Sequence, residues 1–240
     1  MAETVVLLHG FAGTRHGWDL VADRLDAERY RPVALDLRGH GDARDARPVS
    51  FGGCAADVAA AAPERFVLCG YSLGGRVALH VALAHPERVS RLVLVASTAG
   101  IEDAVQRDER RAADERLAAD VEDGTIEDFA DRWMRQPLFA GTPAAAARHW
   151  RADLLRNDPA ALAAVLRGVG AGAMTPLWDR LGELQMPATI IAGERDGRYT
   201  AIGRRLAAAL PAARLLGVPG AGHGLPREAP QGGAAAIASG

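Results

Sequence analysis

The sequence predicts an α/β fold, in which a mostly parallel, doubly wound sheet receives a block of helices before its last two strands. Short apolar runs recur along the 240-residue chain and are almost continuously apolar, as expected for strands that helices cover on both faces. Helical segments, for example residues 18–27 and 74–85, separate most of these runs. An alternation of strands and helices is typical of a parallel sheet.

Six of these runs are the expected strands of the sheet. They lie at residues 4–10, 31–37, 65–70, 91–97, 188–194 and 214–220. A chain of this length can bury one large core, which favours a single α/β unit over separate domains. The last ten residues, QGGAAAIASG, make a poor helix by composition, and we expect this tail to fray.

The strand pattern stops between the fourth and fifth runs, where the chain is rich in Ala and Arg. In this segment we expect a helix to start wherever a capping side chain precedes a proline or an acidic residue of the first turn. The predicted caps are Thr125, Thr142, Asp158 and Thr175. We therefore predict a core of residues 1–98 and 186–240, with a helical cap at residues 99–185 over the carboxyl ends of the strands. The alternative is an extra helical layer with no part in a site.

Composition narrows the classes of function. The formal net charge is −2, so a nucleic-acid partner is not expected. The chain contains no lysine, which excludes Schiff-base catalysis, pyridoxal phosphate attachment and a P-loop lysine. Its two cysteines, Cys54 and Cys69, predict no disulfide framework, and no cluster of side chains has metal-ligand spacing. We therefore expect neither a cofactor nor a metal.

No stretch of the sequence predicts export or insertion into a membrane. The apolar runs are too short to cross a bilayer, and the segment MAETVVLLHG is more typical of a strand than of a secretion signal. The expected location is therefore cytoplasmic. No feature of the sequence indicates an oligomeric state.

The segment VLCGYSLGGRVAL places a serine between a predicted strand and a predicted helix. Residues 70–74 form a G-x-S-x-G pattern. Glycines are needed at such a strained corner because a β-carbon would collide with neighbouring backbone. The helix that begins after Ser72 directs free N–H groups toward the hydroxyl. Ser72 is therefore the predicted nucleophile; the alternative is an ordinary glycine-rich turn.

A serine nucleophile needs a base and an acid. The chain offers seven histidines: His9, His16, His40, His80, His85, His149 and His223. Only His223 follows both Ser72 and a plausible acid, which is the chain order of the triad in folds with this serine corner. The predicted acid is Asp196, directly after the fifth strand, where it would fix the histidine tautomer. Asp103 and Glu194 are alternative acids.

Two backbone N–H groups are the expected stabilisers of negative charge on a reacting oxygen. One is that of Leu73, directly after the serine, and the other comes from the loop HGFAG, with Phe11 as the expected donor. The alternative for this loop is an ordinary β-turn. Its position directly after the first strand favours the oxyanion role.

The motifs LLHGFAG, GYSLGG, GERD and AGHGL together resemble the α/β-hydrolase superfamily over essentially the whole chain. This resemblance implies the α/β-hydrolase fold. A narrower similarity is carried by HGFAGTRHGWD, GYSLGGRVAL, GERDGRYTAI and the cap stretches QRDERRAADERLA and FADRWMRQPLFA. These resemble the 2-succinyl-6-hydroxy-2,4-cyclohexadiene-1-carboxylate synthases of menaquinone biosynthesis. The resemblance implies a lyase that eliminates pyruvate from a substrate with several carboxylates, using the triad serine as a base.

Four residues are expected to bind the substrate. Arg76 lies one helical turn after Ser72, and a guanidinium suits a carboxylate better than it suits an apolar ester. The resemblance implies the same role for Arg110 and Trp133 in the cap, and it places Tyr71 beside the nucleophile. The alternative for Arg110 and Trp133 is a surface arginine and a core aromatic.

The chain departs from that family at three points. Leu154 stands where the family has another arginine, and Arg151 and Arg156 are the candidate replacements. Asp42 stands where the family commonly has serine. The expected carboxyl-terminal helix is short and interrupted by PQGG. These differences concern the substrate rather than the triad.

The sequence leaves three alternative functions. The first is the menaquinone-pathway lyase, whose substrate is a small molecule that carries carboxylates. The second is a serine carboxylesterase, thioesterase or carbon–carbon bond hydrolase, in which Ser72 forms an acyl-enzyme. The third is a ligand-binding member of the superfamily without turnover, and the complete set of Ser72, Asp196 and His223 argues against it.

Overall fold

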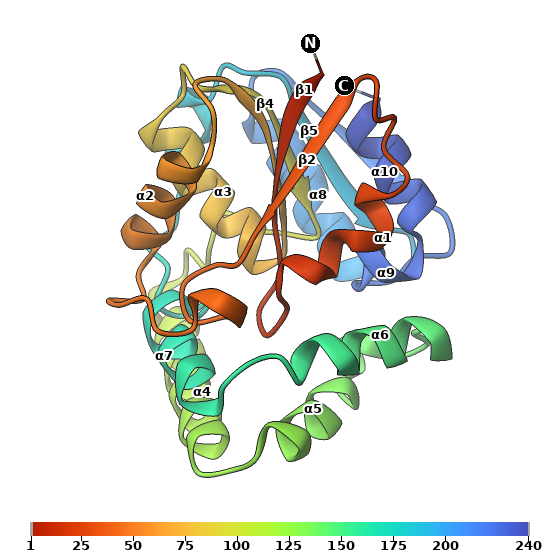
Figure 1. Ribbon diagram of the computed structural model, residues 1–240. Coiled ribbons are helices and arrows are strands. Elements are labelled where there is room, and N and C mark those ends of the chain that lie inside the picture. Colours follow the sequence, from red (N-terminus) through yellow and green to blue (C-terminus); the bar gives the residue numbers. More distant parts are fainter. Residues whose placement is uncertain (1, 240) are drawn as a thin grey trace.

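The computed structural model describes residues 2–239, which contain one six-stranded, fully parallel sheet (Figure 1). The strand order is β2-β1-β3-β4-β5-β6. The strands are β1 (Glu3–Leu8), β2 (Tyr30–Leu35), β3 (Phe66–Tyr71), β4 (Val89–Val95), β5 (Ala188–Gly193) and β6 (Ala213–Val218). Each of the six predicted apolar runs forms a strand, so the α/β prediction is confirmed.

Helices cover both faces of the sheet. Successive side chains of a strand point to opposite faces, so each strand buries side chains against helices on both sides. Val6, Leu8 and Leu68 are fully buried on one face, and Val5 and Leu7 are fully buried on the other. The helices of the first face are α2 (Phe51–Ala61), α3 (Leu73–Ala84) and α8 (Gly197–Ala209). Those of the second face are α1 (Asp19–Ala22), α9 (Leu225–Glu228) and α10 (Pro230–Ala238). Burial on two sides explains the almost continuous apolarity of the strands.

The helix predicted at residues 18–27 is much shorter in the structure. A 3₁₀ turn, η1 (Arg15–Trp18), leads into α1, which ends at Ala22. After this point the backbone tightens, and the N–H of Leu25 donates to the carbonyl of Ala22 at 3.1 Å. Leu25 thereby turns into the core, where it is buried.

The carboxyl-terminal segment forms α10, although its composition predicts a poor helix. Ile237 is fully buried against the sheet, and Ala234 is buried beside it. Arg91 donates to the carbonyl of Ile237, and the hydroxyl of Tyr30 donates to the carbonyl of Ala238 at 3.1 Å. Tertiary packing therefore compensates for the weak helix propensity of this segment.

Four helices lie together at one end of the sheet, apart from the helices that cover its faces (Figure 1). They are α4 (Ala104–Glu122), α5 (Ile126–Met134), α6 (Ala144–Leu154) and α7 (Pro159–Val169). A short 3₁₀ turn, η3 (Pro137–Phe139), lies between α5 and α6, and another, η4 (Trp178–Glu183), lies between α7 and β5. A further 3₁₀ turn, η2 (Gly41–Ala43), follows β2. We refer to α4–α7 as the cap helices; the division into core and cap at residues 99 and 185 stays a prediction.

Two of the four predicted helix caps are present. Thr125 accepts the N–H of Asp128 at 3.1 Å, and Asp158 accepts the N–H of Ala161 at 2.9 Å. These side chains satisfy N–H groups that have no partner inside the helix.

The other two predicted caps are wrong. Thr142 does not cap α6; its hydroxyl donates to Glu228 at 3.1 Å instead. No helix begins directly at Thr175, because the N–H of Leu177 pairs with the carbonyl of Ala99 at 2.8 Å and η4 starts only afterwards. In both places a hydrogen bond to a residue distant in sequence replaces the expected helix start.

No helix in the part of the chain that the structure describes is both long and apolar enough to cross a membrane.

Candidate active site

Ser72 lies at the corner between β3 and α3 with φ 51° and ψ −109°. This backbone is strained for a residue with a β-carbon, and such strain persists only where the surrounding structure fixes it. Two glycines allow the close approach: a β-carbon at Gly70 would overlap the backbone of Gly74, and one at Gly74 would overlap the carbonyl of Leu8. Ser97 Oγ donates to the carbonyl of Ser72 at 2.8 Å. The corner is therefore held from several sides.

His223 and Asp196 form a buried pair after β6 and β5. His223 Nδ1 lies 2.8 Å from Asp196 Oδ2, and the two side chains are 3% and 8% exposed. The other carboxylate oxygen accepts the N–H of Tyr199 at 3.1 Å. Burial alone would raise the pKa of Asp196, but the hydrogen bonds from His223 and Tyr199 outweigh it and leave this pKa below its usual value. An ionised carboxylate on Nδ1 leaves the lone pair of the neutral imidazole on Nε2.

The two alternative acids lie elsewhere. Asp103 caps α4 and accepts the N–H of Gln106 at 2.8 Å. Glu194 is exposed. Of the three candidates, the structure pairs only Asp196 with His223.

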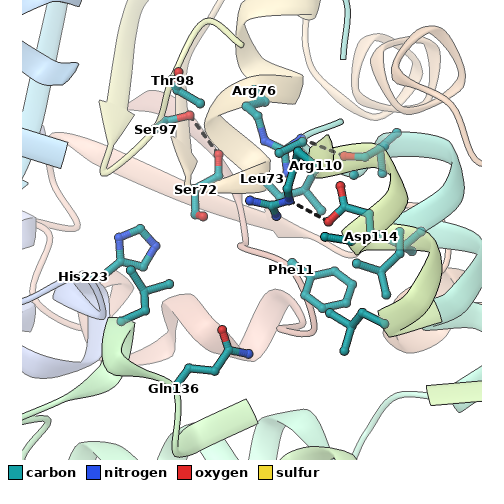
Figure 2. Close-up of a pocket in the computed structure, with 18 of the residues that line it drawn as sticks. Phe11, Ser72, Leu73, Arg76, Ser97, Thr98, Arg110, Asp114, Gln136 and His223 are labelled. Atoms are coloured by element: carbon teal, nitrogen blue, oxygen red, sulfur yellow. Dashed lines mark hydrogen bonds and ion pairs between the residues drawn. The ribbon is translucent and has the colours of Figure 1, made fainter. Parts of the chain in front are cut away.

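A cavity of about 390 Å³ lies between the strand ends and the cap helices, and both Ser72 and His223 line it. Figure 2 shows the Ser72 hydroxyl and the His223 imidazole directed into the same space. Among the described residues the Ser72 hydroxyl has no hydrogen-bond partner. Nucleophile–base contacts are often loose before a substrate binds.

Phe11 and Leu73 also line the cavity. Within residues 2–239, neither backbone N–H donates to a protein acceptor: Leu73 is the first residue of α3, and Phe11 lies in the turn after β1. Both N–H groups are therefore available to a substrate oxygen.

Two buried histidines support the loop that carries Phe11. His40 Nε2 accepts the N–H of Ala12 at 3.2 Å, and its ring lies edge-on to that of His9 with centroids 4.7 Å apart. Burial lowers the pKa of both rings, and that of His40 falls well below 6.5. Both are therefore neutral near pH 7, which keeps Nε2 of His40 available as an acceptor.

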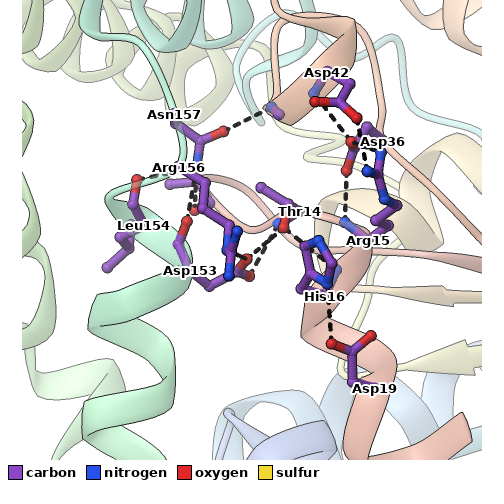
Figure 3. Close-up of polar contacts among 12 residues, drawn as sticks. Thr14, Arg15, His16, Asp19, Asp36, Asp42, Asp153, Leu154, Arg156 and Asn157 are labelled. Atoms are coloured by element: carbon purple, nitrogen blue, oxygen red, sulfur yellow. Dashed lines mark hydrogen bonds and ion pairs between the residues drawn. The ribbon is translucent and has the colours of Figure 1, made fainter.

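The cap is tied to the same loop (Figure 3). Asp153, near the end of α6, accepts the N–H of Thr14 at 3.0 Å and also the hydroxyl of Thr14. Asn157 donates to the carbonyl of Ala12 at 2.9 Å and accepts the N–H of Gly41 at 3.2 Å. The loop beside Ser72 thus depends on side chains from the cap.

A second set of ties joins the cap to the loop that carries His223. Glu228 is buried and accepts the N–H of Gly222 at 2.7 Å, Arg195 Nη2 at 2.7 Å and the Thr142 hydroxyl at 3.1 Å. Arg195 also donates to the carbonyl of Gly141 at 3.0 Å. Glu228 therefore holds together the segment before α6 and the segment before α9.

Arg76 is the unusual charge of the site. It lines the cavity from α3, it is 8% exposed, and its Nη1 donates to the carbonyl of Val169 at 2.8 Å. No carboxylate in the described chain pairs with it. Burial lowers its pKa to about 10, so the guanidinium is still charged at neutral pH. A buried charge without a counter-charge is unfavourable for folding.

Arg110 lines the cavity from α4, on the same side as Arg76 (Figure 2). Its Nε donates to Asp114 Oδ1 at 2.7 Å, and Asp114 Oδ2 accepts the N–H of Gly172 at 3.0 Å. Asp114 is buried, so it fixes the guanidinium from behind. The two terminal nitrogens of Arg110 are not used in this contact.

The structure separates the two aromatic residues expected at the substrate. Trp133 lines the cavity and packs on Phe11, with ring centroids 5.0 Å apart. Tyr71 does not line it; its ring lies 5.5 Å from the His223 ring and 5.8 Å from the Trp150 ring. Tyr71 therefore packs near His223 rather than in the main cavity.

Neither candidate replacement for the arginine missing at position 154 lies at the cavity. Leu154 is buried among the cap helices. Arg151 pairs with Asp131 at 2.7 Å, and Arg156 is more than half exposed near Asp153. Asp42 pairs with Arg15 at 2.7 Å, away from the cavity (Figure 3).

Sequence reasoning missed three residues that the structure brings to the site or its support. Arg198 lines the cavity, Asp114 fixes Arg110, and Asn157 holds the loop at Ala12. The position of Arg198, two residues after the predicted acid, was a usable signal. Asp114 and Asn157 gave none, because their partners depend on tertiary contacts.

No group of three or more His, Cys, Asp or Glu side chains within residues 2–239 is arranged to hold a metal ion.

A family model described as the alpha/beta hydrolase family matches residues 5–236. The chain belongs to the alpha/beta hydrolase family. Its sheet and helices agree with this, and the prediction of an enzyme with the α/β-hydrolase fold is confirmed.

Relatives within the family are similar over most of their length. A Bacillus subtilis protein, provisionally named 2-succinyl-6-hydroxy-2,4-cyclohexadiene-1-carboxylate synthase, is 34% identical, covering 96% of this chain and 87% of the relative. A Klebsiella pneumoniae protein of the same name, without that qualification, is 33% identical, covering 86% and 82%. A solved structure described as MenH from S. aureus is 28% identical with a TM-score of 0.93, covering 99% of this chain and 92% of that one. The narrower resemblance predicted from the motifs is confirmed.

Proposed function

We propose that this chain is a 2-succinyl-6-hydroxy-2,4-cyclohexadiene-1-carboxylate synthase, a lyase of menaquinone biosynthesis that releases pyruvate from a carboxylate-bearing substrate. The observation that carries the proposal is Arg76, a buried cation on the helix of Ser72 without a carboxylate partner among the described residues. Such a site gains most from an anionic ligand. The relatives named for this activity support the same choice.

In this proposal Ser72, His223 and Asp196 move a proton. His223 Nε2 takes the hydroxyl proton of Ser72, and the serine oxygen removes a proton from a carbon of the substrate. The electron pair of that C–H bond enters the ring as the C–O bond to the enolpyruvyl group breaks. The leaving enolate receives a proton from His223 and becomes pyruvate, so the enzyme returns to its starting state. Asp196 stabilises the imidazolium between these steps.

The backbone N–H groups of Phe11 and Leu73 bind the substrate oxygen that gains negative charge during proton removal. Donors of this kind are already oriented before the reaction, which is why each contributes substantially to the rate. Arg76 and Arg110 bind a substrate carboxylate, and Trp133 packs against the carbon framework beside them. No acyl-enzyme is needed in this scheme. A cytoplasmic location is part of the proposal.

The test is release of pyruvate from the succinyl-enolpyruvyl cyclohexene substrate, followed with lactate dehydrogenase and NADH. We expect turnover by the purified protein and loss of it in Ser72→Ala and Arg76→Met. Arg116→Met is the matched control, because Arg116 is an exposed arginine outside the cavity. The same preparations are tested against a panel of simple nitrophenyl esters.

Each result separates the lyase from the hydrolase. Absence of pyruvate, together with a burst of nitrophenol that depends on Ser72 but not on Arg76, would identify a serine hydrolase and overturn the lyase proposal. Pyruvate release that survives Arg76→Met would remove the argument on which the choice of an anionic substrate depends.

A further inference from the structure

A third arginine, Arg198, lies at the cavity on the triad side. It lines the cavity together with Ser72 and His223, it follows Asp196 by two residues, and its side chain is exposed. Its guanidinium carbon lies 5.9 Å from the centroid of the Tyr199 ring, which in turn lies 4.5 Å from the His223 ring. Arg198 is therefore at the rim beside the base, whereas Arg76 and Arg110 lie on the other side of Ser72 in Figure 2.

Arg198 has no polar partner among residues 2–239, although neighbouring arginines do. Arg195, three residues earlier, pairs with Glu228 at 2.7 Å. Arg205, about two turns further along α8, pairs with Glu102 at 2.5 Å. All three arginines are exposed, so exposure does not explain why Arg198 lacks a partner. Arg204 on α8 also has no carboxylate partner within residues 2–239, but of these two unpaired arginines of the helix only Arg198 lines the cavity.

Helix stability gives no reason for a cation at this position. Arg198 is the second residue of α8, a helix of 13 residues, and positive charge in the first turn opposes the helix dipole. An acidic or neutral side chain would suit the fold better there. An unpaired cation at an unfavourable helix position, facing the substrate cavity, indicates a role in binding.

We propose that Arg198 binds a second carboxylate of the substrate and so makes the enzyme selective for substrates with at least two separated carboxylates. One carboxylate lies between Arg76 and Arg110, the reacting carbon lies over Ser72, and the other carboxylate reaches the rim beside His223. The inference rests on the proposed function and adds the number and placement of the anionic groups. Because Arg198 is exposed, its contribution is to affinity and association rather than to the chemical step.

The kinetic test compares Arg198→Gln with Arg204→Gln. Arg204 is exposed on the same helix but does not line the cavity, so it controls for the loss of one positive charge on α8. We expect KM for the polycarboxylate substrate to rise about five- to tenfold in Arg198→Gln, with kcat changed less than about twofold. The rise should shrink at high salt, where the wild-type KM itself increases. Arg204→Gln should match the wild type.

Direct binding separates this inference from the reaction. Tricarballylate, succinate and acetate are titrated calorimetrically into the wild type and both variants. We expect Arg198→Gln to weaken tricarballylate binding about five- to tenfold and to leave acetate binding unchanged. If pyruvate is never released but this pattern holds, the proposed function fails and the inference stands.

Two results would overturn the role of Arg198. The first is an unchanged KM together with unchanged tricarballylate binding in Arg198→Gln, whether or not pyruvate is released. The second is a fall in kcat with KM unchanged, because that pattern would mean that Arg198 acts on Asp196 and the triad rather than on the substrate.

Discussion

The two sides of the cavity differ in whether their charged groups have partners. On the side of His223, both oxygens of the Asp196 carboxylate accept a hydrogen bond, one from His223 and one from the N–H of Tyr199, and the pKa of Asp196 lies below its usual value. On the arginine side, Arg76 is as buried as Asp196 but has only the carbonyl of Val169 as an acceptor and no carboxylate partner in the described chain.

This difference agrees with the roles that we propose, in which His223 and Asp196 perform the chemistry and Arg76 binds the substrate. A base and its acid must keep one geometry through the reaction, so the fold satisfies their hydrogen bonds in advance. A ligand-binding cation must keep its hydrogen-bonding capacity for the substrate, so the fold leaves it unpaired at the expense of stability. Arg110 is intermediate, because Asp114 fixes one edge of its guanidinium.

The largest expected effect is on the triad side. Asp196→Asn keeps the shape of the side chain but favours the wrong imidazole tautomer, so kcat should fall about 1,000- to 10,000-fold. KM should change little, because the arginines are untouched. Steady-state pyruvate release measures both constants, with Asp103→Asn, the alternative acid, as the control. Equal losses in the two variants would contradict the assignment of Asp196.

The second-largest effect is expected when the unpaired charge of Arg76 is removed. Arg76→Met keeps an apolar stem but removes the buried charge, so KM should rise about 10- to 100-fold. The same change should increase the free energy of unfolding by roughly 1–3 kcal/mol, because desolvation of the charge no longer opposes folding. Urea titration measures the second effect. A less stable variant would show that the protein already compensates this charge.

A third experiment probes the histidine behind the oxyanion loop. His40 has a pKa well below 6.5 in the folded protein, so below pH 6.5 the unfolded chain binds a proton that the folded protein does not. The free energy of unfolding therefore falls as the pH drops from 6.5 toward the folded pKa, by about 1.4 kcal/mol per pH unit for one proton. His40→Gln should remove this part of the slope.

Urea titrations at a series of pH values between 7 and 5 measure that slope. His149→Gln, at an exposed histidine, is the matched control. An unchanged slope in His40→Gln would mean that burial does not lower the pKa of His40 in the folded protein.

The smallest effect concerns the strained corner. Ser72→Gly should be more stable than Ser72→Ala by about 1 kcal/mol, because glycine adopts φ 51° without strain whereas alanine does not. Both variants lack the hydroxyl, so the difference isolates the backbone. Thermal unfolding of the two proteins side by side measures it, and equal melting temperatures would mean that the corner stores no strain.

The sheet was predictable because a strand that is buried on both faces is apolar at almost every consecutive residue. All six strands lie within a few residues of their predicted positions. The caps at Thr125 and Asp158 were predictable for the same reason, since a cap contacts an N–H only a few residues away. At Thr142 and Thr175 the local signal was equally good, yet distant partners decided the outcome.

The residues of the candidate site also fall into those that the sequence indicated and those that depend on tertiary contacts. The sequence indicated Asp196 and His223 by their positions after strands, and the structure pairs them; their catalytic roles stay predictions, as do those of the oxyanion and substrate-binding residues. Arg110 and Trp133, expected only from a resemblance, do line the cavity, whereas Tyr71 does not. Arg198 and Asn157 depend on how the cap meets the core, which no single stretch of sequence records.

The ties between cap and core couple two loops that lie far apart in the sequence. Asp153 and Asn157 connect the cap to the loop of Phe11, and Thr142 connects it through Glu228 to the loop of His223. A cap that lifts away must break these bonds, so such a movement would release both loops at once. The positions of Phe11 and His223 therefore depend on the same four helices.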